Sequence, residues 1–382
     1  MDERLFNEID ALYPEYVNTW VDVCNIESQT KNKAGVDAVG EYFIKMANER
    51  GWDVDVHEED VSGNAVCITM NKDAKGQAVC LSGHMDTVHP AGLFGTPAAH
   101  IEGDKIYGPG VIDCKGGVVV GFLAMDALRL TGFTDRPVKL ILQSDEENSS
   151  WTSEKRTVEF MCEKAKGARA FLNLEGHDKN TLCIKRKGII TFEFTVNGVA
   201  GHASKCATLG ANAIHEAAHK IIELEKFKNA DGLTCCCSLI SGGTAQNTIP
   251  EKCVFRANVR FATNDEAEYI KKFAMELAEK TVVEGCHTTV EIVSYRVAME
   301  YADRNERLVH DMNAIYEENG LAPFEIGGRL GGSDAAYTTM AGIPTIDNIG
   351  VEGGDIHSVN EFAYLSSLPK MAKRIALAVK YL

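Results

Sequence analysis

Five short polar clusters in this sequence contain the residue types that proteins use to bind metal ions. Four of them follow apolar runs expected to be strands, and one opens a helix; their central residues are His84, Asp113, Glu147, Glu175 and His357. The carboxyl ends of strands in a doubly wound sheet open into one crevice, so we expect these side chains to meet there. Carboxylates that crowd together raise one another's pKa unless they share a cation. The clusters therefore predict a metal centre.

The ligand types narrow the choice of metal. Histidine and carboxylate, without a paired Cys-x-x-Cys set, favour zinc or its first-row neighbours over calcium or magnesium, with cobalt or manganese as possible substitutes. Two ions sharing a carboxylate would hold a carbonyl group and a water molecule together. Glu146, beside Glu147, is then free to accept a proton from water as general base. Asp86, two residues after His84, can accept the imidazole N–H and fix its orientation.

Each cluster alone has an ordinary structural explanation. An H-x-D triplet is common, adjacent glutamates are usually solvated, and Gly116-Gly117 at the start of a helix often reflects close packing. The presence of all five clusters on one chain favours a hydrolytic metal centre. The alternative from another class is a catalytically silent metal-binding or scaffolding protein. Such a protein would be expected to have lost a ligand or the base, and neither is missing.

A competing motif, H-E-x-x-H, spans His215–His219 and is the signature of mononuclear zinc proteases. On a helix over residues 211–227, both histidines lie at the margin of the apolar face, beside Glu216 and Glu223 on the polar side. The apolar face is expected to contain Ile214, Ala217, Ala218, Ile221, Ile222 and Leu224. No third-ligand motif follows at a familiar spacing. We therefore expect this motif not to be the catalytic centre.

The order of the expected elements predicts two domains. In the first half, helices alternate with strands, which indicates an α/β fold whose mostly parallel sheet is covered on both faces. The helices are expected over residues 1–24, 33–50, 116–130 and 154–164, and the strands over 65–70, 78–82, 138–142 and 170–174.

The pattern changes near residue 188. From there to residue 293 the order is strand, helix, strand, strand, helix, strand, which matches the split βαβ (ferredoxin-like) unit. The α/β alternation then resumes, with helices over 306–319, from 334 and over 365–381, and a strand over 344–348. We predict a discontinuous α/β domain of residues 1–187 and 299–382, with an inserted α+β domain of residues 188–298.

Composition excludes several classes of partner. The formal net charge of −16 over 382 residues disfavours nucleic acid and anionic membrane surfaces. The charged first 25 residues do not resemble a signal peptide, and no long apolar run could span a bilayer. The twelve cysteines are scattered, as expected for thiols in the reducing cytoplasm.

Several of these motifs resemble one known family. They are Leu81–Val88, Tyr107–Gly117, Ser144–Glu147, Gly201–Ala203, Gly331–Ala335 and Ile356–Ser358. They resemble the dinuclear zinc family of glutamate carboxypeptidase, acetylornithine deacetylase, succinyl-diaminopimelate desuccinylase and aminoacylase, most of all its glutamate carboxypeptidase branch. The resemblance covers almost the whole chain in the family's order. It implies a zinc-exopeptidase-like fold. It also implies an enzyme that cleaves a peptide or an N-acyl amide bond adjacent to a carboxylate, as a carboxypeptidase, a dipeptidase or a deacylase.

The resemblance also implies roles for single residues. Asp113 would bridge two zinc ions, with His84 and Glu175 completing one site and Glu147 and His357 the other. Glu146 would be the base and Asp86 the orienting carboxylate. The Asp113–Cys114 peptide would be cis.

In the inserted domain, the resemblance implies a lid that also forms a homodimer. His202 would reach the partner's active site and stabilise the oxyanion. The substrate contacts would come from Asn247, Arg260, Gly331, Gly332 and Ser333, while Arg329 competes with Arg260 for the substrate carboxylate.

Two segments depart from the family pattern. Asn148-Ser149-Ser150 stands where glycine is common, and Gly176-His177-Asp178 stands where proline is typical. The second departure leaves open whether His177 touches the site or has a plain loop role.

Overall fold

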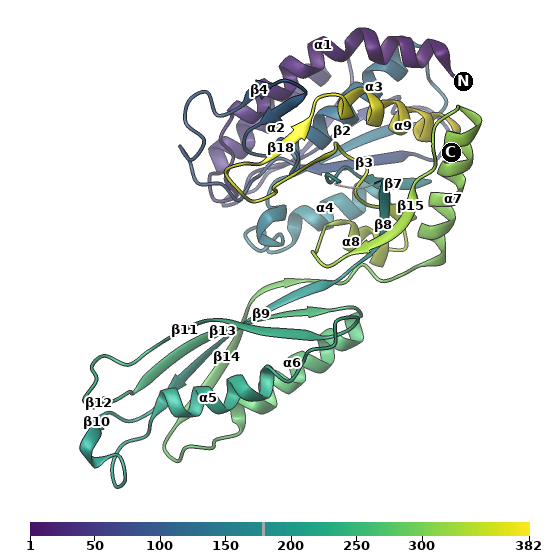
Figure 1. The fold of residues 1–382 in the computed structure, drawn as a ribbon. Coiled ribbons are helices and arrows are strands. Elements are labelled where there is room, and N and C mark those ends of the chain that lie inside the picture. The colour runs from purple at the N-terminus through teal and green to yellow at the C-terminus, as the bar shows by residue number, and fades with distance from the viewer. Residues whose placement is uncertain (178–179) are drawn as a thin grey trace. The chain divides into compact units, whose positions relative to one another are not determined.

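A computed structural model describes residues 1–177 and 180–382, which divide into two compact units (Figure 1). Unit 1 contains Met1–Ile184, Tyr301–Gly328 and Asp334–Leu382. Unit 2 contains Lys185–Glu300 and Arg329–Ser333. The expected insertion, residues 188–298, falls within unit 2, which also takes in the short segment at 329–333.

The central sheet of unit 1 is mostly parallel, which confirms the predicted α/β class. Its six strands lie in the order β1 (Asp53–His57), β2 (Ala65–Met70), β6 (Val138–Gln143), β3 (Val79–His84), β7 (Ala170–Asn173) and β16 (Thr345–Ile346). The last four are parallel to one another, whereas β1 and β2 run antiparallel to their neighbours. Strand β3 lies in the middle and is buried along its whole length.

Helices cover both faces of this sheet. On one face, alternate strand residues such as Leu81 and Leu140 join the large core formed with α1 (Glu3–Asn25), α2 (Lys33–Glu49), α3 (Lys115–Leu130), α7 (Asp303–Glu318) and α9 (Ser367–Tyr381). On the other face, Cys80 and Ile141 pack with α4 (Arg156–Ala165), against which α8 (Ala335–Met340) lies. Since successive strand residues point to opposite faces, a sheet covered twice needs apolar residues at every position.

Smaller sheets hold the later segments of unit 1. The strands β17 (Gly353–Gly354), β18 (Phe362–Tyr364), β5 (Lys105–Tyr107) and β4 (His100–Glu102) pair in that order. This sheet places the loop around His357 next to the segment that leads to Asp113. A further pair joins β8 (Thr181–Arg186) and β15 (Glu325–Arg329).

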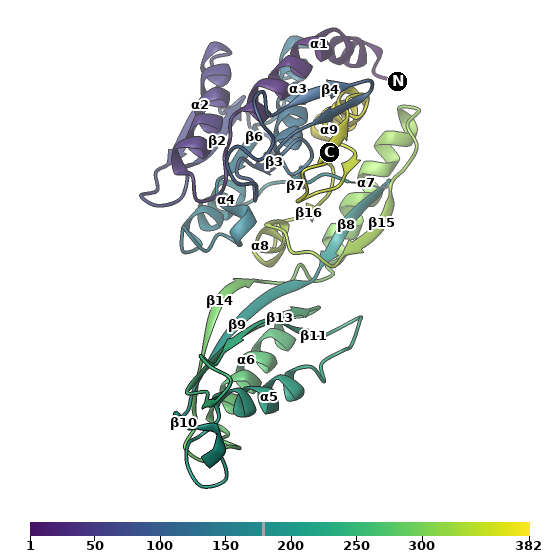
Figure 2. The same ribbon diagram turned by 60° about the vertical axis from the view of Figure 1, so that its left-hand side comes forward.

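Unit 2 has the predicted strand and helix order. Its antiparallel sheet runs β11 (Thr234–Gly242), β13 (Lys252–Phe261), β9 (Gly188–Asn197) and β14 (His287–Arg296). Helices α5 (Ala213–Leu224) and α6 (Asn264–Glu279) lie on one face of it (Figure 2). A short pair, β10 (Gly201–His202) with β12 (Thr248–Ile249), stands next to the start of β13. A capping box between Thr263 and Glu266 begins α6.

The predicted apolar face of α5 is confirmed in part. Ala217 and Leu224 are buried and Ile221 packs against the core, but Ile214 and Ile222 are exposed. The residues that face the sheet are Ala213, Glu216, Ala217, Lys220 and Leu224, whereas Ile222 is 60% exposed. Small alanines let the helix approach the strands closely. The buried Glu216 carboxylate lies 3.0 Å from Lys220 Nζ and accepts the N–H groups of Val282 and Val283. A buried charge with such partners is tolerated, so the hydrophobic pattern placed Glu216 wrongly on the polar side.

Two further observations concern the cysteines and the helices. All twelve cysteines are free thiols. Within residues 1–177 and 180–382, no helix combines the length and apolar character that crossing a bilayer requires.

Candidate metal centre

The five candidate ligands of unit 1 are brought together by the ends of neighbouring strands. His84 is the last residue of β3, Glu147 lies in the single helical turn after β6, and Glu175 follows β7. These three strands are adjacent and parallel, so their carboxyl ends share one edge. Asp113 lies two residues before the start of α3, and His357 lies in the loop between β17 and β18. The predicted convergence of the five side chains is therefore what the structure has.

Asp113 occupies the middle of the cluster. Its Oδ1 lies 3.1 Å from His84 Nε2, and its Oδ2 lies 3.1 Å from His357 Nε2. Glu175 Oε1 is 3.7 Å from the same nitrogen of His84, and Glu147 Oε2 is 3.2 Å from that of His357. The arrangement thus forms two groups, one around each histidine, that share the Asp113 carboxylate.

Burial makes this group of acids costly without a cation. Burial, and then the Asp113 charge, raise the pKa of Glu147 to about 8 and that of Glu175 well above its usual value. Although burial opposes it, hydrogen bonds to His357 and His84 hold the pKa of Asp113 far below its usual value. Contacts with Asp113 and Glu147 in turn raise the pKa of His357 to about 11. A bound cation would therefore stabilise the ionised carboxylates of this cluster.

The donor set fits a pair of first-row metal ions. His84, Asp113 and Glu147 form one group whose ligand atoms all lie within 4.8 Å of one another. Imidazole nitrogens and carboxylate oxygens in such proximity are typical zinc ligands.

Asp86 positions several residues of the cluster through hydrogen bonds. His84 Nδ1 lies 2.9 Å from the backbone oxygen of Asp86 and 3.3 Å from its carboxylate. The same carboxylate accepts the backbone N–H groups of Glu146 and Glu147, each at 3.2 Å, and the hydroxyl of Thr30 at 2.7 Å. Asp86 therefore fixes both the imidazole and the turn that carries the two glutamates. Glu146 itself is buried.

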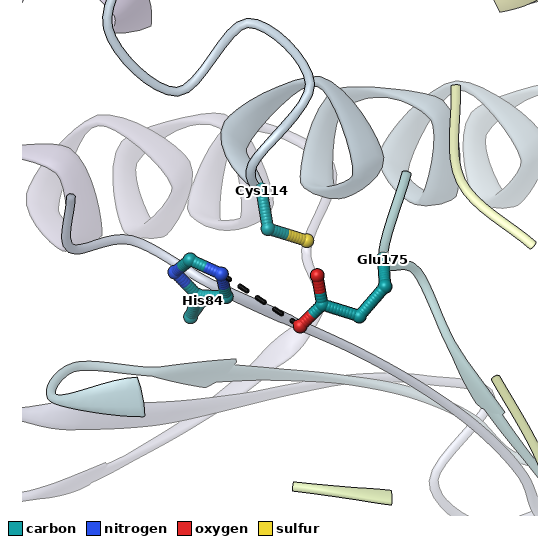
Figure 3. A group of neighbouring side chains, drawn as sticks. All are labelled: His84, Cys114 and Glu175. Carbon is teal, nitrogen blue, oxygen red and sulfur yellow. Dashed lines mark ion pairs between the residues drawn. The ribbon is translucent and has the colours of Figure 1, made fainter. Parts of the chain in front are cut away.

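Cys114, expected from the sequence only as part of a cis peptide, is itself a neighbour of the site. Its thiol forms a close group with His84 and Glu175, in which the ion pair between His84 and Glu175 is marked (Figure 3). Burial, and then the charge of Glu175, raise the pKa of Cys114 well above its usual value, so it stays a thiol. It donates to the backbone oxygen of Leu174 at 3.2 Å. The Asp113–Cys114 peptide is cis, which confirms the expectation.

Glu361 is a residue that the sequence analysis missed. Its Oε1 accepts the backbone N–H groups of Ile112 and Asp113, each at 3.2 Å, and its Oε2 lies 2.7 Å from His89 Nε2. Glu361 is fully buried. Because it lies four residues after His357, it ties the loop of one histidine to the backbone of Asp113. Its place in the Ser358-Val-Asn-Glu361 run after His357 is the only sequence signal.

The turn after the paired glutamates keeps an unusual backbone. Ser149 has a φ of 64° and Ser150 a φ of 53°. Both values lie in the left-handed region that favours glycine, the residue expected there from the family pattern. Two serines therefore occupy, in this chain, a turn whose backbone conformation favours glycine.

The other expected site residues lie in unit 2, in two places. His202 is exposed, with Nδ1 2.8 Å from the Ser204 hydroxyl, and the backbone oxygen of Asn247 accepts the N–H of Ala203. Arg260 lies near the far end of β13, with its Nε donating to Asn258. Burial, and then Arg296, lower the pKa of Arg260.

The segment Gly331–Ser333 lies beside the end of the unit 2 sheet that contains Arg260 and Arg296. The backbone oxygens of Gly331 and Gly332 accept hydrogen bonds from Arg186 at 3.2 Å, and Gly332 packs against Ile189 and Arg296. The backbone oxygen of Arg329 accepts the N–H of Lys187.

His177 is buried, and its backbone pairs with Val351 and Gly353, which begin the segment that carries His357. Asp178, its neighbour in the expected departure from the family, lies outside the described residues.

Two histidines and three carboxylates thus gather beside one edge of a mostly parallel sheet, a donor set typical of metal-dependent hydrolases. The chain belongs to peptidase family M20/M25/M40, whose model matches residues 80–381, and this confirms the resemblance. The chain is 29% identical over 391 residues to carboxypeptidase G2 from Pseudomonas sp. (strain RS-16), with 98% of this chain and 92% of that protein covered.

A second relative is succinyl-diaminopimelate desuccinylase from Nitrosospira multiformis. It is 27% identical over 298 residues, which cover 73% of this chain and 75% of that protein. The solved structure of an M20 family metallo-carboxypeptidase from Sulfolobus solfataricus matches with a TM-score of 0.77 at 17% identity. That match covers 96% of this chain and 99% of the other, and it shows the shared fold.

Proposed function

We propose that this metallohydrolase uses two zinc ions to cleave a peptide or N-acyl amide bond adjacent to a substrate carboxylate. The observation that carries the proposal is the Asp113 carboxylate, which offers one oxygen to the His84 group and the other to the His357 group. Relatives named carboxypeptidase and desuccinylase support the two forms of the reaction, peptide cleavage and deacylation. Carboxypeptidase or dipeptidase action is our main proposal, and N-acyl amino acid deacylation is the alternative.

The ligand assignment follows the two groups around the histidines. His84 and Glu175 would hold one ion, Glu147 and His357 the other, and Asp113 both; cobalt or manganese would suit the same donors. When bound, such a pair supplies Lewis acidity that polarises a carbonyl oxygen and acidifies water.

Glu146 is the proposed general base. It precedes Glu147 in the helical turn after β6, and the Asp86 carboxylate accepts the backbone N–H groups of both residues. Glu146 takes a proton from the attacking water and returns it to the leaving amine. Asp86 meanwhile holds the His84 ring in one orientation, which keeps the ligand set in place.

Unit 2 is proposed to bind substrate and to form a homodimer. The Arg260 guanidinium would hold the substrate carboxylate, Gly331, Gly332 and Ser333 would line its site, and Asn247 would contact the substrate. Arg260 lies about 26 Å along β13 from its first residue, Lys252, at about 3.3 Å per residue, and the β10–β12 pair precedes that residue. His202 and Arg260 of one chain are thus too far apart to touch one small substrate. A second copy that supplies His202 for the oxyanion resolves this.

The substrate is proposed to be a small peptide or an N-acyl amino acid, and the location cytoplasmic. Twelve free thiols support a reducing compartment. The acidic charge of the chain makes nucleic acid or an anionic membrane a poor partner.

The deciding experiment measures zinc content and hydrolysis together. We expect two zinc equivalents per chain and chelator-sensitive turnover of at least one member of a panel of N-acetyl amino acids, N-succinyl-diaminopimelate, acetylornithine and dipeptides ending in glutamate. Glu146→Gln should keep both zinc equivalents and lose activity by a factor of about 10²–10⁴. A protein that binds two zinc ions but hydrolyses nothing in the panel would instead support a silent metal-binding scaffold. Substantial turnover by Glu146→Gln would remove the base assignment.

A further inference from the structure

The H-E-x-x-H motif of unit 2 contains a pair of histidines that the hydrolase function does not use. His215 and His219 lie one turn apart on α5, and their Nε2 atoms are 3.1 Å from each other. Their rings are 4.8 Å apart. His215 is exposed, and His219 is partly exposed on the same side of the helix. The two nitrogens therefore face each other on the accessible side of α5.

This spacing suits one bound ion. A metal about 2.05 Å from each nitrogen would see them at an angle of about 98°, between the octahedral and tetrahedral values. The helix holds the two side chains in this relation, since residues at i and i+4 are neighbours on a helix surface. Binding would thus require little rearrangement of the pair.

The glutamate of the motif does not take part. Glu216 points into the core, where it contacts Lys220 and accepts the N–H groups of Val282 and Val283. It is held there by three donors and cannot serve as a base beside the histidines. The pair can bind a metal, therefore, without the arrangement that a zinc protease needs.

We propose that His215 and His219 chelate one divalent first-row transition-metal ion, with water in the remaining positions. Two imidazoles favour copper, nickel and zinc over magnesium or calcium. Within the described part of the chain, the groups of three or more metal-ligating side chains are those of the centre in unit 1. The α5 pair is consequently a two-ligand site, weaker than the proposed catalytic centre.

The test uses the full chain without an added histidine tag, first saturated with zinc at the centre in unit 1. On immobilised Ni²⁺, the unaltered protein should be retained and should elute at higher imidazole concentration than His215→Ala or His219→Ala. In solution, calorimetric titration with Ni²⁺ should find one site whose affinity falls about tenfold or more in each variant, because a chelate loses its second ligand.

His287→Ala is the matched control, since His287 is an exposed histidine of the same unit, at the start of β14. It should behave like the unaltered protein, and circular dichroism should show the same helix content in all variants. Retention that survives either single substitution on α5, or that falls equally in the control, would overturn the chelate. Hydrolysis should be unchanged in both α5 variants, whichever substrate of the panel the protein hydrolyses.

Discussion

Asp113 shows how much depends on a single carboxylate. It lies between two histidines from distant parts of the chain, and each of its oxygens faces one of them. Its position depends in turn on Glu361, which accepts the backbone N–H groups of Ile112 and Asp113. The ligand and the residue that positions it are therefore separate in sequence but adjacent in the fold.

Removing the Glu361 carboxylate should weaken metal binding. Glu361→Ala leaves His89, one buried N–H group and one partly buried N–H group without their acceptor, at a cost of up to about 1–3 kcal/mol in stability for each. Because Asp113 is then less firmly held, we expect zinc affinity to fall about 10–100-fold. Competition with a chelating dye measures this affinity.

Glu361→Gln is the matched variant. Its amide oxygen can still accept from the backbone, so most of the zinc affinity should return. An alanine variant that folds and binds zinc as tightly as the unaltered protein would show that Glu361 does not position Asp113.

The two kinds of residue differ in how far sequence reveals them. His84, Glu147 and Glu175 could be placed together because each follows a strand of one parallel sheet, and chain topology fixes where strands end. The contacts of Glu361 with Ile112 and of Cys114 with Leu174 have no comparable pattern. They depend on which loops meet after folding.

At the scale of elements, α3 approaches the end of β7 very closely. A Cβ added to Gly117 would lie 2.0 Å from the backbone oxygen of Leu174, the residue before Glu175. Glycine at the start of α3 thus allows the helix to reach the strand end that carries a candidate ligand. The packing explanation for Gly116-Gly117 and the chemical one therefore apply together.

Gly117→Ala should force these elements apart. We expect a loss of about 1–3 kcal/mol in unfolding free energy from overpacking, measured by urea denaturation. Gly40→Ala is the control, since the nearest atom to an added Cβ in α2 is the sulfur of Met85 at 3.4 Å. That variant should be neutral or slightly more stable, because alanine favours a helix. Equal stability of the two variants would contradict the close approach.

The elements that the sequence predicted well are long or strongly apolar. The helices α1, α2, α3 and α9 and the buried strands β2, β3, β6 and β7 were predicted within a few residues. Strands of two or three residues, such as β4, β17 and β18, are too short to show a period, yet they position the loop of His357. The buried face of α5 was predicted only in part, because Glu216 and Lys220 compensate each other in the core.

At the scale of the whole molecule, the change from α/β alternation to the split βαβ order was visible in the sequence. The attachment of residues 329–333 to unit 2 was not, because it depends on Arg186 binding the backbone of Gly331 and Gly332. The surface of the chain also bears on how two copies would assemble.

Strand β11 has the features of a pairing edge. It is at the end of the unit 2 sheet, and Leu239 and Ile240 on it are each 60% exposed. Unpaired backbone groups beside exposed apolar side chains favour the addition of another strand. A two-fold axis at this edge would join two copies through the same surface. Our proposal that His202 serves the partner's site requires such a dimer.

The double substitution Leu239→Lys, Ile240→Lys should therefore weaken the dimer and reduce hydrolysis together. Charge repulsion across the edge should raise the dissociation constant about 100-fold or more, since each like-charge contact at an interface costs several kcal/mol. Analytical ultracentrifugation gives the oligomeric state, and activity should fall in step with the fraction of dimer while zinc content stays constant. Met275→Lys, at an exposed apolar residue of α6, is the control and should leave both unchanged. A chain that sediments as a monomer at full activity would rule out the role of His202 across the dimer, because no partner would then be present to supply it.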